Sequence, residues 1–412
     1  MARLTALLAA LALLAGPPAP RAGTLLWHAE DAGGRVLASQ EADRPFNPAS
    51  VMKVGTTWWA LERLGPDHRY TTAFGITGRW SPESGVLRGR LVVRGGGDPD
   101  FQLENAFMVA RELERLGLRE VREGLVVEGP FLMGWEGGPE RRQKEGDRRA
   151  REAGERLLRA LDSSRWTTEH RQTWRKFCAR RGWDPSKPPL LRIGDSVRVG
   201  RVPGVRTLVE HRSNPLEVIL KRFNVYSNND IERIADGLGG PAALQAFLRD
   251  RLEDTEGRIT VATACGEGSN TMTPRLVVRM LRRFGAFLEG LGLAPRDVLP
   301  VPGCDPGPVP RMFPELAAEP LSKAVTCKTG TLRETDGGVA VLAGWFATPG
   351  GGRVLFCVAS PRAGRELAKR REQEQRWLLD LIDRSGGALR RPCGTTLVFS
   401  DTGASVRASG RL

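Results

Sequence analysis

The sequence predicts an α+β protein in which a second domain is inserted into the first. Strand patterns occur at both ends of the chain, two within residues 24–39 and three within 324–360, and helical patterns fill much of the stretch between them. These strands can form one sheet only if the two ends of the chain meet. The middle must then contain an insertion, because a further run of strands begins near residue 70.

The length of 412 residues is enough for two or three domains, each able to bury its own core. Hydrophobic residues make up 40% and charged residues 27%, which is typical of a folded protein. Six cysteines could pair in an oxidising compartment, in any of 15 connectivities. No CxxC occurs and no cysteine stands beside a histidine at zinc spacing, so we predict neither a metal nor another cofactor.

The formal net charge is +14, from 62 Lys and Arg against 48 Asp and Glu. Arginine residues spread along the whole chain supply this excess. Such a distribution indicates an arginine-rich composition rather than a groove that binds a polyanion, so no nucleic-acid partner is predicted. Residues 141–181 alone hold 14 basic and 6 acidic residues. The apolar stripe of Leu157, Leu158 and Leu161 favours a solvated amphipathic helix there over a dedicated polyanion site.

Residues 1–23 have the pattern of a cleavable signal peptide. Arg3 precedes an apolar run over 4–15 and a Gly/Pro-rich stretch. A helix that spans the bilayer needs about 20 residues, so this run is too short to be a transmembrane helix. The alternative to a signal peptide is a short buried helix. We therefore predict an exported protein of the periplasm or cell envelope, with at most peripheral association with membrane or wall.

The first elements are a hairpin and a helix. Residues 24–30 and 35–39 have strand patterns around a Gly-Gly turn. Prolines near 45–48 break the chain, and a helix follows over 49–64, ended by Gly65-Pro66. Its apolar positions recur at three- and four-residue steps: Val51, Val54, Trp58 and Leu61.

The later elements define the predicted domains. Strands are expected within 70–97 and at 124–127, 324–332, 339–347 and 353–360, and helices at 107–118, 215–226, 231–238, 241–252, 274–291 and 366–382. We predict a discontinuous main domain made of 24–68 and 205–395. Residues 69–204, with the basic helical segment 141–181, form the inserted mixed domain, and 396–412 form a polar tail.

Ser50-Val51-Met52-Lys53 places a hydroxyl and an amine three residues apart at the start of a predicted helix, so both lie on one face. A neutral lysine at this distance can take the serine proton, which requires burial or a nearby cation to lower its pKa. The backbone N–H of a serine at a helix start lies near the oxyanion of its acyl adduct. This S-x-x-K pattern alone is a weak signal.

Two further motifs follow in the chain. Ser227-Asn228-Asn229 comes directly after a predicted helix, and Lys328-Thr329-Gly330-Thr331 lies within a predicted strand. Each alone is explained as well by an Asn-rich turn or by a strand with an incidental lysine. In the order S-x-x-K, S-x-N and K-T-G they match the active-serine set of penicillin-binding proteins and serine β-lactamases.

The chain also resembles the D-alanyl-D-alanine carboxypeptidase/endopeptidase family of DacB type, which belongs to the low-molecular-mass penicillin-binding proteins. The resemblance covers about 24–382 and is carried by FNPASVMKV, GGGDPDF, HRSNPLEVILKRFNVYSNND and KTGTL followed by LAGWFA. It implies a β-lactamase/transpeptidase-like domain, an antiparallel sheet flanked by helices with a helical subdomain, and an inserted domain. The segment 141–181 and the loop ACGEGSNTMTP depart from the family pattern.

The resemblance also assigns roles. Ser50 is the expected nucleophile and Lys53 its general base, Ser227 the proton relay to the leaving amine, and Asn229 the residue that holds the substrate amide and Lys53. The K-T-G strand is expected to bind the terminal carboxylate of the substrate through the charge of Lys328 and the hydroxyls of Thr329 or Thr331, while Gly330 lets the substrate backbone approach.

The resulting prediction is an exported serine DD-carboxypeptidase that cleaves D-Ala-D-Ala in peptidoglycan stem peptides and binds penicillin and other β-lactams covalently. A DD-endopeptidase activity on cross-linked stems stays open. Two alternatives remain: a β-lactamase or esterase on the same fold, and a non-catalytic cell-wall-binding protein. A fluorescent penicillin that stays covalently attached distinguishes the first prediction from both.

Overall fold

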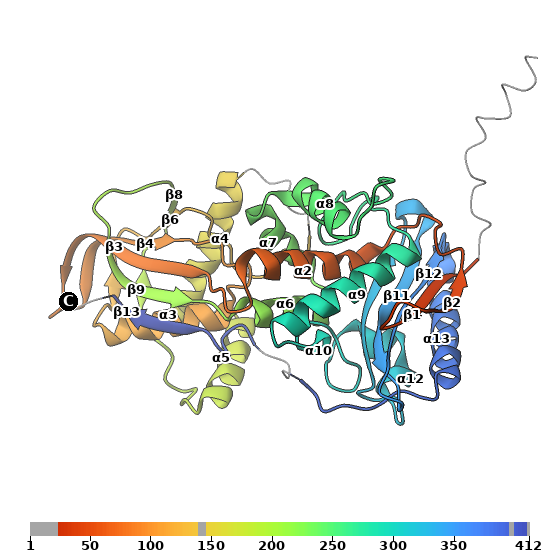
Figure 1. Ribbon diagram of the computed structural model, residues 1–412. Coiled ribbons are helices and arrows are strands. Elements are labelled where there is room, and N and C mark those ends of the chain that lie inside the picture. Colours follow the sequence, from red (N-terminus) through yellow and green to blue (C-terminus); the bar gives the residue numbers. More distant parts are fainter. Residues whose placement is uncertain (1–23, 139–145, 395–398, 410–412) are drawn as a thin grey trace, which may run out of the picture.

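Two sheets lie at opposite ends of an elongated molecule, and helices fill the space between them (Figure 1). The computed structural model describes residues 24–138, 146–394 and 399–409. The predicted signal peptide over 1–23 lies outside these residues. None of the helices in the described ranges is long and apolar enough to cross a membrane.

The first sheet joins the two ends of the chain, as predicted. Its five antiparallel strands have the order β10-β11-β12-β1-β2. The strands are β1 (Leu26–Asp31), β2 (Val36–Gln40), β10 (Val325–Leu332), β11 (Val339–Ala347) and β12 (Arg353–Pro361). Strand β1 pairs with β12, so the N-terminal hairpin and the three strands of the C-terminal third form one sheet. The predicted α+β fold with an inserted domain is confirmed.

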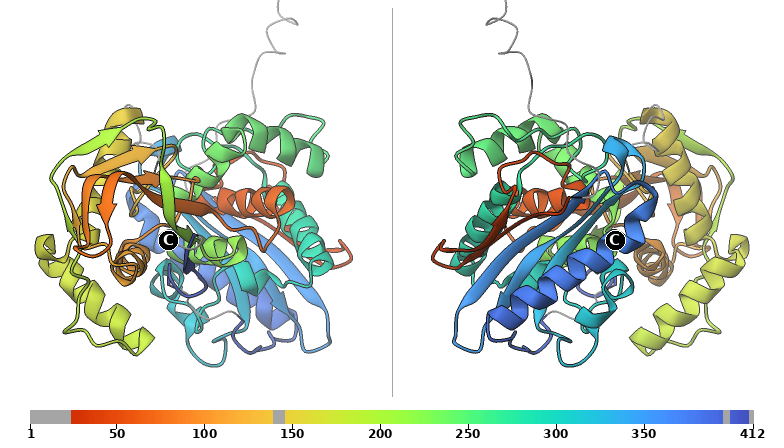
Figure 2. Two further views of the ribbon diagram at one scale, coloured as in Figure 1. Left: turned by 90° about the vertical axis from the view of Figure 1, so that its left-hand side faces the viewer. Right: turned by 90° about the vertical axis from the view of Figure 1, so that its right-hand side faces the viewer.

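Helices cover both faces of this sheet (Figures 1 and 2). Along β12, Phe356 and Val358 pack on one face with Trp377 of α13, while Leu355 and Cys357 belong to the core on the other face, under α2 and α9. This alternation follows from the two-residue period of a strand, and it explains why β11 and β12 are hydrophobic almost throughout.

Most helices of the described chain follow the predicted pattern with small shifts at their ends. The helices are α2 (Met52–Leu64), α3 (Leu103–Arg115), α4 (Gly146–Leu161), α5 (Thr168–Arg181), α6 (Leu216–Tyr226), α7 (Glu232–Gly237), α8 (Gly240–Arg251), α9 (Pro274–Gly290), α10 (Pro295–Val298), α11 (Pro308–Met312), α12 (Pro314–Ala317) and α13 (Leu367–Arg384). The short helices α10, α11 and α12 were not predicted. Local signals set several ends. Thr273 caps α9 by accepting a hydrogen bond from the Leu276 N–H, and Pro274 occupies the first turn.

The second sheet belongs to the inserted segment. Its path is β13-β9-β3-β4-β5-β7, and β6 joins β4 to β8. The strands are β3 (Thr71–Ser81), β4 (Val86–Arg94), β5 (Glu120–Val121), β6 (Leu125–Glu128), β7 (Arg192–Ile193), β8 (Val197–Val199), β9 (Arg206–Arg212) and β13 (Ser405–Ala408). The sheet packs against α3 and α4 and forms with them an apolar core separate from that of the first sheet.

Two segments differ from their predicted place. Strand β9 pairs with β3, so the second sheet extends beyond the predicted boundary at residue 204. In the predicted polar tail 396–412, β13 pairs with β9 as an edge strand, whereas 396–398 and 410–412 lie outside the described residues. Strand β9 has three charged residues among seven, and β13 has only four residues, so neither sequence by itself predicts a strand until a neighbouring strand supplies the pairing.

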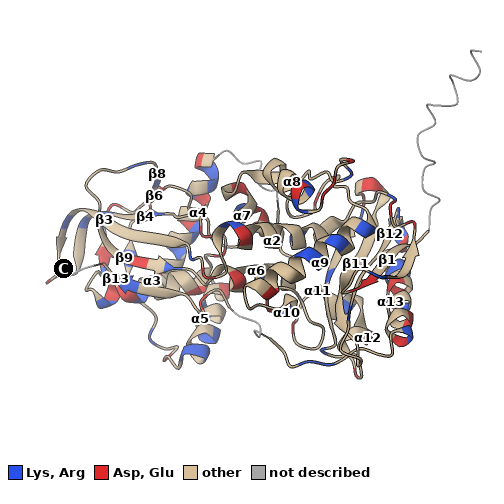
Figure 3. Cartoon of the chain, viewed as in Figure 1, with Lys and Arg blue, Asp and Glu red and all other residues tan. Residues whose placement is uncertain are grey.

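The described part of the basic segment 141–181 forms two helices, α4 and α5, rather than one; residues 141–145 lie outside the description. The predicted stripe of leucines is buried against the second sheet, and α5 packs through Trp174 and Phe177. Figure 3 shows acidic residues among the basic ones along much of the chain. This arrangement agrees with the solvated amphipathic interpretation.

One of the possible cysteine pairings is present. Cys304 and Cys393 form a disulfide between residues 89 positions apart, and it attaches the segment after α13 to the loop after α10. The other four cysteines are buried and unpaired with each other.

Candidate active site

Ser50 lies in a single 3-10 turn, Ala49–Val51, that leads directly into α2. Ala49 has a left-handed φ of 46°, an unusual conformation for a residue with a side chain. The Asn47 side chain accepts a hydrogen bond from the Ala49 N–H (3.0 Å) and donates one to the Gly268 carbonyl (2.8 Å). Asn47 therefore holds the turn that presents the Ser50 hydroxyl.

Lys53 is fully buried one helical turn later, directly beneath Ser50. Its Nζ lies 2.8 Å from Ser50 Oγ, 2.7 Å from Asn229 Oδ1 and 2.6 Å from the Cys265 carbonyl. Burial lowers the pKa of Lys53 to about 8, and the carboxylates of Glu267 and Glu232 oppose this shift. A substantial fraction of Lys53 is therefore neutral near physiological pH, while Ser50 stays partly exposed.

The second motif lies where α6 ends. Ser227 has a left-handed φ of 53° that terminates the helix, and Asn228 caps the next turn by accepting a hydrogen bond from the Asp230 N–H. This reversal turns Ser227 and Asn229 toward different lysines. Ser227 Oγ accepts a hydrogen bond from Lys328 Nζ (2.8 Å), and Asn229 accepts one from Lys53.

The third motif lies on the edge strand β10. Lys328 is fully buried, and its Nζ also donates to the Thr329 carbonyl (2.9 Å). Burial lowers the pKa of Lys328 well below its usual range, and the charge of Lys53 lowers it further. Gly330 lies against the Ser50 turn, since a Cβ on Gly330 would come within 2.7 Å of the Pro48 carbonyl oxygen. Thr331 is partly exposed at the end of the strand.

All eight predicted site residues therefore gather at the junction of α2, α6 and β10. Ser50, Lys53 and Asn229 form one hydrogen-bonded chain, and Ser227 and Lys328 form a second. The backbone of the K-T-G strand contacts the S-x-x-K turn at Gly330.

The loop 264–267, which departs from the family pattern, is part of the site that motif analysis missed. Its Cys265 carbonyl binds Lys53, and Glu267 accepts a hydrogen bond from Asn229 Nδ2. Glu232 holds the loop by accepting hydrogen bonds from the Ala264 and Cys265 N–H groups (3.0 and 2.6 Å). A backbone carbonyl can belong to any residue type, so no motif predicts its role. The departure of this loop from the family pattern was the only signal in the sequence.

The inserted segment also reaches the site. The backbone N–H of Glu136 donates to Asp230 Oδ2 (2.8 Å), one residue after Asn229. A Cβ on Gly138 would come within 3.1 Å of Asn229 Cβ. The stretch 134–138 thus forms a wall of the site beside the S-x-N motif.

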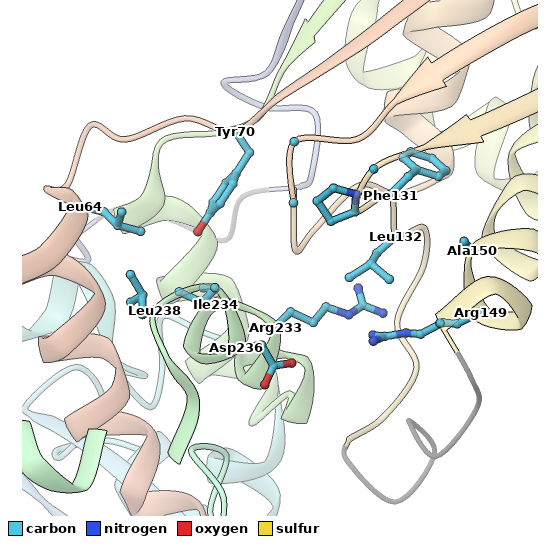
Figure 4. Close-up of a pocket in the computed structure, with 16 residues that line it drawn as sticks. Leu64, Tyr70, Phe131, Leu132, Arg149, Ala150, Arg233, Ile234, Asp236 and Leu238 are labelled. Carbon is cyan, nitrogen blue, oxygen red and sulfur yellow. The ribbon is translucent and has the colours of Figure 1, made fainter. Parts of the chain in front are cut away.

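A separate cavity of about 580 Å³ lies between the two parts of the molecule (Figure 4). Phe131 and Leu132 line it from the inserted segment, and Ile234 and Leu238 line it from around α7. Its cations, Arg149 and Arg233, both bind Glu136. None of the eight predicted site residues is among its lining residues, so this cavity is distinct from the serine–lysine centre.

The chain belongs to the D-Ala-D-Ala carboxypeptidase 3 (S13) family, whose model matches residues 18–139 and 192–380. It is therefore a serine peptidase of the D-Ala-D-Ala carboxypeptidase class, and the resemblance found in the sequence is confirmed. The match omits 140–191, which contain α4 and α5. This gap agrees with the weak resemblance noted for the basic segment.

Solved structures share the fold. The predatory endopeptidase Bd0816 from Bdellovibrio bacteriovorus, in complex with the immunity protein Bd3460, is 21% identical with a TM-score of 0.73, and the match covers 93% of this chain and 100% of that one. The penicillin G acylated Bd3459 endopeptidase from the same organism is 21% identical, with a TM-score of 0.72 and coverage of 94% and 100%. Penicillin binding protein 4 (dacB) from Haemophilus influenzae is 17% identical, with a TM-score of 0.62 and coverage of 88% and 97%.

Proposed function

We propose that this enzyme is exported and removes the terminal D-Ala from peptidoglycan stem peptides through an acyl-enzyme on Ser50. The contacts of Lys53 carry this proposal, because one buried amine joins the Ser50 hydroxyl to the Asn229 amide. The family supplies the substrate class. Similarity to proteins named as peptidoglycan endopeptidases supports a second activity on cross-linked stems.

In the first step, neutral Lys53 takes the proton of Ser50 as Oγ attacks the carbonyl of the penultimate D-Ala. Burial of Lys53 favours the neutral amine that this step requires. The backbone N–H groups of Ser50 and Thr331 stabilise the oxyanion. The close approach of Gly330 to the Ser50 turn supports this arrangement.

In the second step, the C–N bond of the tetrahedral adduct breaks, and the leaving amine of D-Ala receives through the Ser227 hydroxyl the proton that Lys53 took from Ser50. The hydrogen bond from Lys328 to Ser227 Oγ supports a relay through the hydroxyl. Asn229 holds the substrate amide with its side chain and keeps Lys53 in line with Ser50. Water then hydrolyses the ester on Ser50 and restores the enzyme.

We infer export from residues 1–23 and from the disulfide of Cys304 and Cys393, which forms in oxidising compartments such as the periplasm. We also propose that the catalytic domain consists of 24–68 and of residues from about 213 to 394. The inserted domain then comprises about 69–212 together with strand β13.

A penicillin-labelling experiment tests the nucleophile. The β-lactam ring amine stays tethered after attack and blocks the water needed for deacylation, so the adduct is expected to persist. Mass spectrometry is expected to place the added mass on the peptide that contains Ser50, and Ser50→Ala to abolish both the adduct and D-Ala release. The control variant Ser84→Ala, in the exposed turn between β3 and β4, is expected to label normally.

The other outcomes separate the alternatives. An adduct that turns over rapidly would favour a β-lactamase, and a protein that binds wall polymer but takes up no penicillin would be a non-catalytic binder. An adduct on any residue other than Ser50 would overturn the proposed mechanism.

A further inference from the structure

A second cation, Arg371, contacts the K-T-G strand from α13, which covers the face of the sheet opposite to α2 and α9. Arg371, in the first turns of α13, donates a hydrogen bond from Nη2 to Thr331 Oγ1 (2.9 Å). Thr331 stands two residues after Thr329, so the two hydroxyls lie on the same face of β10. Arg371 lies forty positions after Thr331 in the chain, so no short sequence motif predicts that the two residues are in contact.

Lys328 is poorly placed to supply charge to a substrate at this strand. It is only 1% exposed, and its amine is already bound to Ser227 and to the Thr329 carbonyl. Burial also lowers the pKa of Lys328, so its surroundings disfavour the charged form. A carboxylate beside the strand therefore needs another partner.

Arg371 has the properties that such a partner needs. Its guanidinium stays charged at all physiological pH values and can bind a carboxylate through two parallel hydrogen bonds. It is partly exposed, as is Thr331, whereas Lys328 and Thr329 are buried. Within the described ranges Arg371 makes no salt bridge with a carboxylate of the protein.

The acid of the same helix that interacts electrostatically with Arg371, Glu374, does not neutralise it. Glu374 is fully buried one turn later, and its Oε1 accepts a hydrogen bond from Ser360 Oγ (2.8 Å). Burial raises the pKa of Glu374 to about 8, so this carboxyl is largely protonated at pH 7. Arg333 is a further nearby cation and adds to the positive potential.

We propose that Arg371 is a specificity-determining residue of this site that binds the C-terminal carboxylate of the substrate, together with the Thr331 hydroxyl. The inference rests on the proposed function and names the group that selects substrates with a free carboxyl end. It assigns to α13, which otherwise supports the sheet, a direct part in substrate binding.

The test compares acylation by benzylpenicillin, which carries a free carboxylate, with acylation by its methyl ester. Arg371→Gln is expected to slow acylation by the acid about 10- to 100-fold, the effect of losing one charged hydrogen-bond partner, and to change acylation by the ester by less than about 3-fold. Arg371→Lys is expected to recover part of the rate. Arg376→Gln on the same helix removes an exposed charge that pairs with Glu372 and is expected to change neither rate.

Melting temperatures of all variants check that each one folds. Equal losses on acid and ester in Arg371→Gln would assign Arg371 a purely structural role, and an unchanged rate on the acid would also overturn the inference. If the wild type takes up neither compound, the proposed function itself fails. That result differs from a normally labelled wild type with an unaffected Arg371→Gln variant, which would overturn only the carboxylate role.

Discussion

At the scale of single residues, the proposed mechanism depends on the protonation of Lys53. Burial favours its neutral form, and the carboxylate of Glu267 favours its charged form. In the proposed mechanism this amine must be neutral to accept the Ser50 proton. The balance between them determines the pH at which acylation begins.

The rate of acylation by penicillin is expected to rise with pH through a midpoint near 8, the pKa of Lys53. Glu267→Gln removes a negative charge that raises this pKa. The midpoint is therefore expected to move to lower pH, while the glutamine oxygen can still accept the hydrogen bond from Asn229. Lys53→Met is expected to reduce acylation about 10²–10⁴-fold, as for the loss of a general base. Stopped-flow labelling across pH measures each quantity.

Glu256→Gln, an exposed residue that pairs with Arg258, is the matched control for the lost charge and is expected to leave the midpoint unchanged. A shift to higher pH in Glu267→Gln would contradict the assignment of Lys53 as the base.

At the scale of elements, the Ser50 turn is held between two glycines. A Cβ on Gly266 would lie 2.0 Å from the Ala49 carbonyl oxygen, and one on Gly330 would lie 3.0 Å from Ala49 Cβ. Gly266 also has a φ of 88°, in the region that favours glycine. The left-handed Ala49 is thus fixed by backbone packing from β10 on one side and from the loop 264–267 on the other.

Gly266→Ala is expected to displace the Ser50 turn and to slow acylation by about 10²-fold, the effect of moving a reacting group by about 1 Å. The melting temperature is expected to fall as well, because the contacting atoms belong to the backbone. Gly290→Ala at the end of α9 has open space around it and is expected to affect neither property. Normal acylation by Gly266→Ala would show that the turn does not depend on this contact.

At the scale of the whole molecule, Arg233 joins the inserted segment to the helical part. This buried guanidinium donates to the Pro99 carbonyl (2.9 Å) and the Gly134 carbonyl (3.0 Å), and it pairs with Glu136 (3.1 Å). All three partners come from the inserted segment, whereas Arg233 stands on α7, four residues after Asn229. Arg233 therefore helps to hold the site wall 134–138, together with the hydrogen bond from the Glu136 N–H to Asp230 and the ion pair between Arg149 and Glu136.

Arg233→Ala is expected to destabilise the protein by about 3–5 kcal/mol, because it removes the ion-pair partner of the buried Asp230 and the hydrogen-bond donor to the Pro99 and Gly134 carbonyls. Arg283→Ala breaks an exposed pair with Glu253 and is expected to cost at most about 1 kcal/mol. Thermal melting and limited proteolysis of the 134–138 stretch measure the difference. Similar melting temperatures for both variants would contradict a central role for Arg233.

The fold could be predicted from the sequence where local patterns agree with the tertiary structure. Strands β11 and β12 have apolar runs of strand length, and α2 and α9 have clear helical periods and end signals. Strands β9 and β13 could not be predicted, because the charged residues of β9 and the four-residue length of β13 give no local strand signal, and only pairing with distant strands orders them.

The sequence by itself determined the class of enzyme and the eight residues that gather at the site, because three motifs in a set order specify one arrangement of a helix start, a loop and a strand. Only the tertiary structure decided the burial that lowers the pKa of Lys53, the enclosure of Ala49 by Gly266 and Gly330, and the approach of Arg371 to Thr331. The physical reason is that burial, close backbone contact and charge depend on distances across the fold. These distances cannot be read from local sequence patterns, because they join residues that are far apart in the chain.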